Sequence, residues 1–137
     1  MMTVIGYMPD HLVKIRVKDI HTGEVPTIIL TDAMTVMDGE QPVAIFGSFT
    51  FVPGVYHLWG LISEDVRQKP VAFHRVSKEL LGYYEKRTNA RRIQMDVKAS
   101  YIEGQKWAKA LGFEYEGTMK RFGVNGEDFH LYGRITK

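Results

Sequence analysis

Residues 61–72, LISEDVRQKPVA, constrain the fold more than any other part of the sequence. An apolar strand end runs into a short polar loop, and Pro70 then stands where an amphipathic helix begins. The N-terminus of a helix carries unpaired backbone N–H groups and the positive end of the helix dipole, which together suit a pyrophosphate. The segment therefore predicts a strand–loop–helix unit with a phosphate-type turn.

Composition limits the kind of protein that this is. The 137 residues are 45% hydrophobic and 12% aromatic, which is enough for one domain spanning residues 1–137. The net charge of +2 is too weak to indicate a nucleic-acid partner. The absence of cysteine excludes disulfides, a thiol nucleophile and Cys-ligated zinc. With no long apolar run and no signal-like N-terminus, we expect a cytoplasmic protein without a membrane partner.

Two pairs of strand-like segments predict β-hairpins. AMTVMD and QPVAIFGSFTFV, between residues 33 and 52, are rich in Val, Ile, Phe and Thr and flank a turn at Asp38-Gly39-Glu40. A turn at Pro53-Gly54 leads to a further apolar strand over residues 55–63. Residues 113–136 predict a closing hairpin around Asn125-Gly126.

The remaining segments predict helices and one more strand. After Pro70, apolar residues recur at helical spacing to about residue 87, and residues 91–99 alternate as a strand. The spacing Ser100-x-x-Glu103 predicts a capping box for a helix ended by Gly112. At the start of the chain, Asp10 is expected to cap a helix reaching Ile20, although the alternation there also fits a strand.

This order of elements resembles the GNAT superfamily of N-acetyltransferases. The resemblance covers most of the chain and is carried by the phosphate-type turn, by ALGFEYEG at residues 110–117 and by QPVAIFG at residues 41–47. It implies an α/β (α+β) fold: a mixed, mostly antiparallel central sheet of about six to seven strands with helices on both faces. Within the family, the sequence resembles small acetyltransferase-like proteins of tailed phages. This narrower resemblance is carried by residues 43–47, 58–59, 71–81 and 107–113.

The resemblance also implies the cofactor acetyl-CoA and the residues that hold it. The cofactor-binding positions are Leu61, Ile62, Ser63, Arg67, Gln68, Lys69, Val71, Ala72 and Phe73. Pro70 stands where the family's loop has its first glycine, and proline supplies no N–H to a phosphate. The positive side chains of Arg67 and Lys69 are the expected compensation.

Acetyl transfer to an amine requires a group that accepts the amine's proton, and the candidates are His57, Ser63 and Glu64. A lone histidine among apolar residues is more often a packed residue than a base, and Glu64 fits a solvated loop equally well. The tyrosine acid that many family members carry in the last helix is replaced by Ala108, and a frequent asparagine seven residues before it by Tyr101. Asp96 is expected to face solvent or a cleft, because it points away from the apolar residues of its strand.

Two functions remain open at this point. The first is an N-acetyltransferase acting on an unknown amine, and the second is a non-catalytic protein of the same fold that acts in phage particle assembly or host interaction. The histidine spacing supports no metal site. The closing hairpin offers an exposed strand edge, so a homo-oligomer is a further expectation.

Overall fold

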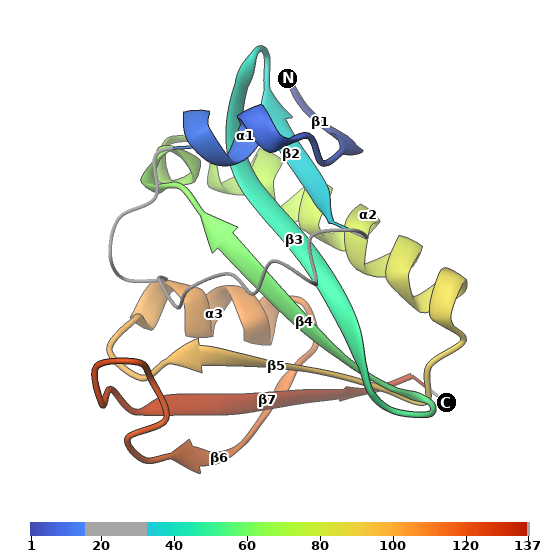
Figure 1. Ribbon diagram of the computed structural model, residues 1–137, viewed down its shortest axis with the longest axis vertical. Coiled ribbons are helices and arrows are strands. Elements are labelled where there is room, and N and C mark those ends of the chain that lie inside the picture. The colour runs from blue at the N-terminus through green and yellow to red at the C-terminus, as the bar shows by residue number, and fades with distance from the viewer. Residues whose placement is uncertain (16–32, 137) are drawn as a thin grey trace. The chain divides into compact units, whose positions relative to one another are not determined.

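The computed structural model describes residues 1–15 and 33–136. Seven strands form one mixed, mostly antiparallel sheet in the order β1-β2-β3-β4-β5-β7-β6. Three α-helices and one 3-10 helix accompany them among the described residues (Figure 1). This confirms the predicted α/β class with a mixed sheet. The described chain forms two compact units, unit 1 with Met1–Ser48 and Trp59–Tyr83, and unit 2 with Phe49–Leu58 and Tyr84–Lys137.

Unit 1 is built around the first strands of the sheet. These strands are β1 (Met2–Gly6), β2 (Met34–Asp38), the first part of β3 (Gln41–Val52) and the end of β4 (Val55–Ile62). β2 pairs antiparallel with β3 across a turn in which Gly39 has a φ of 63°, so the predicted hairpin is confirmed. β1 pairs antiparallel with β2 and had not been predicted. Its short, half-exposed sequence gains strand geometry from this pairing.

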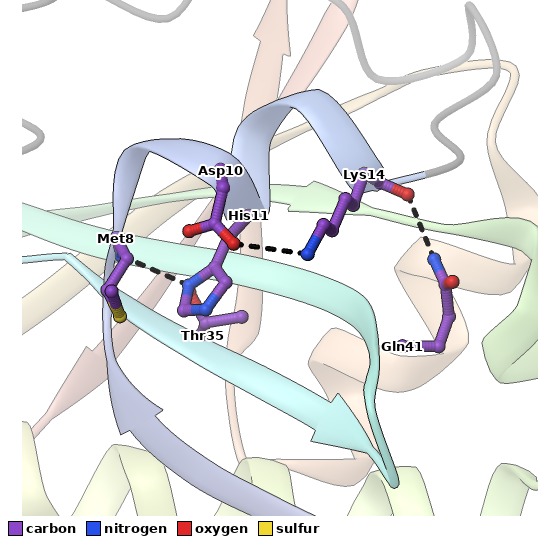
Figure 2. Close-up of polar contacts among 6 residues, drawn as sticks. All are labelled: Met8, Asp10, His11, Lys14, Thr35 and Gln41. Atoms are coloured by element: carbon purple, nitrogen blue, oxygen red, sulfur yellow. Dashed lines mark hydrogen bonds and ion pairs between the residues drawn. The ribbon is translucent and has the colours of Figure 1, made fainter.

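The first helix begins differently from the prediction. Helix α1 spans Pro9–Lys14, and Asp10 lies inside its first turn, where it pairs with Lys14 at 3.2 Å (Figure 2). Pro9 starts the helix because its φ is already helical and no N–H is lost. The backbone N–H of Met8 donates to Nδ1 of His11 at 3.0 Å, so His11 ties down the helix start in place of Asp10. Residues 16–20 of the predicted helix lie outside the described residues.

His11 also connects α1 to the sheet. Its side chain is 5% exposed, and its Nδ1 lies 2.8 Å from the hydroxyl of Thr35, which is fully buried on β2. Since the Met8 N–H can only donate, Nδ1 is the acceptor and the Thr35 hydroxyl donates as well. One nitrogen atom therefore satisfies two donors.

Unit 2 contains the remaining strands and the last helix. These elements are β5 (Arg92–Lys98), α3 (Ile102–Ala110), β6 (Glu114–Met119) and β7 (Phe129–Ile135). β7 lies between β5 and β6 and is antiparallel to both (Figure 1). β4 and β5 pair in parallel, and helix α2 (Pro70–Thr88) lies in the connection between them.

Local sequence explains most of unit 2. Ile93, Met95 and Val97 alternate along β5 and are buried, at 8% exposure or less. Gly112 follows α3 with a φ of 90°, as predicted for a left-handed cap. The Ser100 capping box is wrong, because α3 starts at Ile102 with Tyr101 as its N-cap and no side-chain cap bond.

An ion pair crosses three strands of unit 2. Arg92 on β5 donates two hydrogen bonds to Glu116 on β6, at 2.9 and 2.5 Å. Gly133 on β7 lies between them, and a Cβ at this position would come within 2.6 Å of the Arg92 guanidinium. The pair therefore depends on a glycine in the middle strand. Its hydrogen bonds lower the pKa of Glu116 from its ordinary value and raise the pKa of Arg92.

Within residues 1–15 and 33–136, no helix is long and apolar enough to cross a membrane.

Replacing His11 by Leu should destabilise the protein. The substitution leaves the Met8 N–H and the buried Thr35 hydroxyl without their acceptor, which costs about 1–3 kcal/mol of unfolding free energy. Chemical denaturation measures this loss. The exposed variant Asp10→Asn is the matched control and should leave stability close to that of the wild type. Equal losses in both variants would contradict the role of His11.

The Arg92–Glu116 pair predicts a pH-dependent stability. Glu116→Gln should cost about 0.5–1 kcal/mol at pH 7, since the pair is partly exposed. The folded pKa of Glu116 is depressed, so the pair's contribution is present above the unfolded pKa of about 4.3 and is lost as pH falls through the folded value. Denaturation at pH 7 and at about pH 3 should therefore show the variant's deficit shrinking in acid. Glu114→Gln, an exposed position on the same strand, is the control and should show no comparable deficit at pH 7.

Candidate functional site

Ser63 directly follows β4 and starts the predicted phosphate-type turn in unit 1. Its backbone N–H donates to the carbonyl of Val43 at 2.8 Å, and its hydroxyl accepts from the N–H of Asp65 at 3.1 Å. The side chain is 1% exposed and caps a 3-10 helix, η2, over Glu64–Gln68. Ser63, a predicted catalytic candidate, thus occupies a structural position with its oxygen already engaged.

The backbone of β4 next to Ser63 has one side directed away from β3. Because N–H groups alternate along a strand, the bond from Ser63 to Val43 directs the N–H of Ile62 to the opposite side. The parallel register of β4 with β5 runs from Val55 to Leu58, and residues 59–62 continue beyond it. Leu61 and Ile62 are themselves buried, at 6% and 8% exposure. This backbone can take a ligand in extended conformation, as an added strand would bind.

Both positive side chains of the turn have carboxylate partners. Arg67 lies 3.5 Å from Glu64, and Lys69 lies 2.9 Å from Asp38 on β2. The hydrogen bond from Lys69 lowers the pKa of the Asp38 carboxyl. Glu64, a predicted base, is therefore part of an ion pair. Arg67 and Lys69 are about half exposed, at 44% and 50%, so either can also meet a phosphate from solvent.

The start of α2 leaves two backbone donors. The N–H of Lys69 is bonded to Val66, and the N–H of Phe73 is bonded to Lys69. Pro70 has no N–H. Only the N–H groups of Val71 and Ala72 remain in the first helical turn without an intrahelical acceptor. The predicted cofactor residues therefore differ in exposure. Phe73 is buried and stacks on Phe46, with ring centroids 6.3 Å apart, whereas Gln68 is exposed.

His57 lies in unit 2 within a hydrogen-bonded chain of polar residues. Its Nε2 is 3.0 Å from Oδ2 of Asp96, and its Nδ1 is 3.2 Å from Nε2 of Gln94. Arg92 Nε donates to Oε1 of Gln94 at 2.9 Å. That bond fixes the Gln94 amide, so its NH₂ group faces His57 and donates. His57 is therefore the neutral tautomer with its proton on Nε2, directed at Asp96.

The sequence predicted only part of this series of hydrogen-bonded side chains. Arg92, Gln94 and Asp96 share one face of β5 by strand alternation, and Asp96 was expected to face solvent or a cleft. Its link to His57 required the parallel register, which places His57 beside Gln94. Phe49 stacks on one face of the imidazole, with ring centroids 5.1 Å apart. The side chain of His57 is 13% exposed and that of Asp96 is 25% exposed.

The residue at position 108 of the last helix cannot act as an acid. Ala108 on α3 is fully buried, and the ring of Tyr101 packs over Gly104, where a Cβ would come within 2.5 Å of it. In unit 1, the indole N–H of Trp59 is buried and has no hydrogen-bond partner among residues 1–15 and 33–136. The same described residues contain no group of three His, Cys, Asp or Glu that could hold a metal ion.

Comparison with known proteins supports the fold. No family model matches the sequence, and no curated protein matches it. The structure is similar to a ribosomal-protein-S5-alanine acetyltransferase from Vibrio fischeri, with a TM-score of 0.66 and 20% identity, covering 75% of this chain and 60% of that chain. It is also similar to an acetyltransferase of the GNAT family from Bacillus anthracis, with a TM-score of 0.63 and 17% identity, covering 76% of this chain and 66% of that chain.

A third similar structure contains a cofactor. It is a ribosomal L7/L12 α-N-protein acetyltransferase in complex with coenzyme A, with a TM-score of 0.64 and 16% identity, covering 75% of this chain and 60% of that chain. The chain thus spans about two thirds or less of the length of these three proteins. The matches give no support to the narrower resemblance to phage proteins. At these identities they show the fold alone, and this fold is that of the GNAT acetyltransferases.

Proposed function

We propose that the protein is an acyl-CoA-dependent N-acetyltransferase that transfers acetyl from acetyl-CoA to an amine. The observation that carries the proposal is the passage from β4 through η2 to the N-terminus of α2 within a GNAT fold. This passage combines a strand side that is directed away from β3 with a helix start that offers backbone N–H groups. The similar L7/L12 acetyltransferase in complex with coenzyme A supports the choice of cofactor.

In this proposal the turn holds the phosphates of the cofactor. Val71 and Ala72 supply backbone N–H groups, and Arg67 and Lys69 supply charge in place of the donor that Pro70 lacks. Binding would exchange the carboxylate partners of the two cations for phosphate oxygens. The backbone of residues 61–63 would take the pantetheine arm and the thioester, with the Ile62 N–H on the side directed away from β3.

The reaction needs little covalent help from the protein. The amine nitrogen attacks the thioester carbon, the new C–N bond forms, the C–S bond breaks and coenzyme A leaves as a thiolate that takes up a proton. The amine loses a proton in the same sequence, to water or to a side chain. The main contribution of the chain is to hold the two reactants in orientation, which is a large part of many rate enhancements.

A second function is favoured by two specific observations. Pro70 removes a phosphate donor, and the buried Ala108 stands where many GNAT proteins have a tyrosine acid. Both fit a protein that keeps the fold as a non-catalytic scaffold. Cofactor binding without turnover in an amine screen would support this alternative.

Acetyl-CoA should stabilise the protein against heat. A ligand present at about 100 times its dissociation constant stabilises the folded state by about 2.7 kcal/mol, which raises the melting temperature by several degrees. Lys69→Ala should weaken binding about tenfold, because a charge-assisted hydrogen bond to phosphate contributes roughly that much. Lys78→Ala, an exposed lysine on the middle of α2, is the matched control and should bind as the wild type does. No thermal shift at millimolar acetyl-CoA would overturn the proposal.

Pro70→Gly should strengthen cofactor binding. The change restores an N–H donor at the helix start and the backbone freedom that a close approach to phosphate requires. The same change lowers stability by about 0.4–1 kcal/mol, since glycine leaves the unfolded chain more freedom. Calorimetric titration separates the two effects. Unchanged or weaker affinity for acetyl-CoA would show that the turn does not bind the phosphates through its backbone.

A further inference from the structure

The hydrogen-bonded series of polar side chains in unit 2 ends in a carboxylate oxygen that has no partner among the residues the structure describes. Asp96 accepts from His57 through Oδ2 at 3.0 Å, and its Oδ1 has no partner among residues 1–15 and 33–136. The side chain is 25% exposed. A carboxylate in a partly buried position gains strongly from a charged donor, because solvent screens the interaction less there. Asp96 is thus oriented by the protein on one oxygen and open to a ligand on the other.

The orientation of Asp96 is set by a series of bonds with a fixed direction. Glu116 accepts from Arg92, Arg92 donates to Gln94, Gln94 donates to His57, and His57 donates to Asp96. Both ring nitrogens of His57 are occupied in this arrangement. His57 therefore has no free lone pair for a ligand, and its contribution is to hold Asp96.

Apolar side chains lie beside the His57–Asp96 pair. Phe49 stacks on the imidazole that holds Asp96 and is itself 36% exposed. Leu131 on β7 stands directly opposite Asp96 in the antiparallel register, so the two side chains share a face of the sheet. A carboxylate with an aliphatic side chain opposite it and an aromatic ring stacked on its histidine partner suits a ligand that joins a positive nitrogen to a short carbon chain.

We propose that Asp96 binds the ammonium group of a primary alkylamine, with His57 as its positioning residue. Phe49 and Leu131 contact the carbon chain of the amine. The inference rests on the proposed function only in identifying this amine as the acetyl acceptor; the binding site itself needs no cofactor. A neutral ligand of the same length offers Oδ1 at most an uncharged donor, and an anionic ligand is repelled by the carboxylate.

The test uses n-butylammonium, at pH 7, with the whole chain. Nuclear magnetic resonance follows the methyl groups of Leu131 during titration, and n-butanol and butyrate serve as uncharged and negative ligands of the same length. Butylammonium should give saturable shifts with a dissociation constant on the order of millimolar. The isosteric variant Asp96→Asn should weaken binding at least tenfold, whereas Glu114→Gln, which removes an exposed carboxylate from the same unit, should not.

The positioning role of His57 has its own readout. Long-range proton–nitrogen spectra of the imidazole should show a single tautomer with the proton on Nε2. His57→Gln keeps an NH₂ donor at a similar place and should retain butylammonium binding, whereas His57→Leu should lose it although the protein stays folded by circular dichroism. A tautomer with the proton on Nδ1, or equal binding by the two variants, would overturn the role of His57.

The outcomes separate this inference from the proposed function. If acetyl-CoA binds but butylammonium gives no saturable shift, or if butanol binds equally well, the Asp96 site is wrong and the acetyltransferase proposal stands. If butylammonium binds through Asp96 but acetyl-CoA does not bind, the amine site stands and the acetyltransferase proposal fails.

Discussion

The guanidinium of Arg92 is the constraint on which the polar side of unit 2 depends. Its two terminal nitrogens bind Glu116 across Gly133, and its Nε binds Gln94. Arginine presents these donors in one rigid plane, so fixing the fork on Glu116 also fixes the direction of the third bond. A lysine has no such geometry and would leave Gln94 free to rotate. The orientations of Gln94, His57 and Asp96 therefore follow from this one side chain.

These hydrogen bonds give His57 and Asp96 different roles, which composition alone does not reveal. Histidine is the usual first choice for a base near neutral pH, but His57 is saturated by Gln94 on one side and Asp96 on the other. The open position passes to the carboxylate. Because both ring nitrogens of His57 are hydrogen-bonded, the position left for a ligand in the proposed amine site is the unoccupied oxygen of Asp96 and not the imidazole.

The sequence predicted what depends on neighbours along the chain. The hairpin turn at Gly39, the start of α2 at Pro70, the alternation of β5 and the cap at Gly112 are all local patterns, and all are confirmed. Local patterns also failed at two helix starts, at Ser100 and at Asp10, and at Asp10 the reason is a contact between distant residues. Asp10 was the better local cap, but His11 also reaches Thr35, 24 residues away, and so connects the helix to the sheet. The pairing of His57 with Asp96 likewise needed the register of β4 and β5, which no local pattern encodes.

Pro70 and Ala108 weaken an acetyltransferase in different ways. A missing phosphate donor acts on a part of the cofactor that does not change during the reaction, so it weakens the ground state and the transition state alike. A missing acid acts only where the thiolate leaves, and so it affects the transition state alone. In the proposed enzyme, the first departure would therefore raise KM for acetyl-CoA, while the second would lower kcat. An enzyme tolerates the first by working at a higher cofactor concentration. The second is tolerated only if the departing thiolate takes its proton from water, so Ala108 is the stronger of the two arguments for a scaffold.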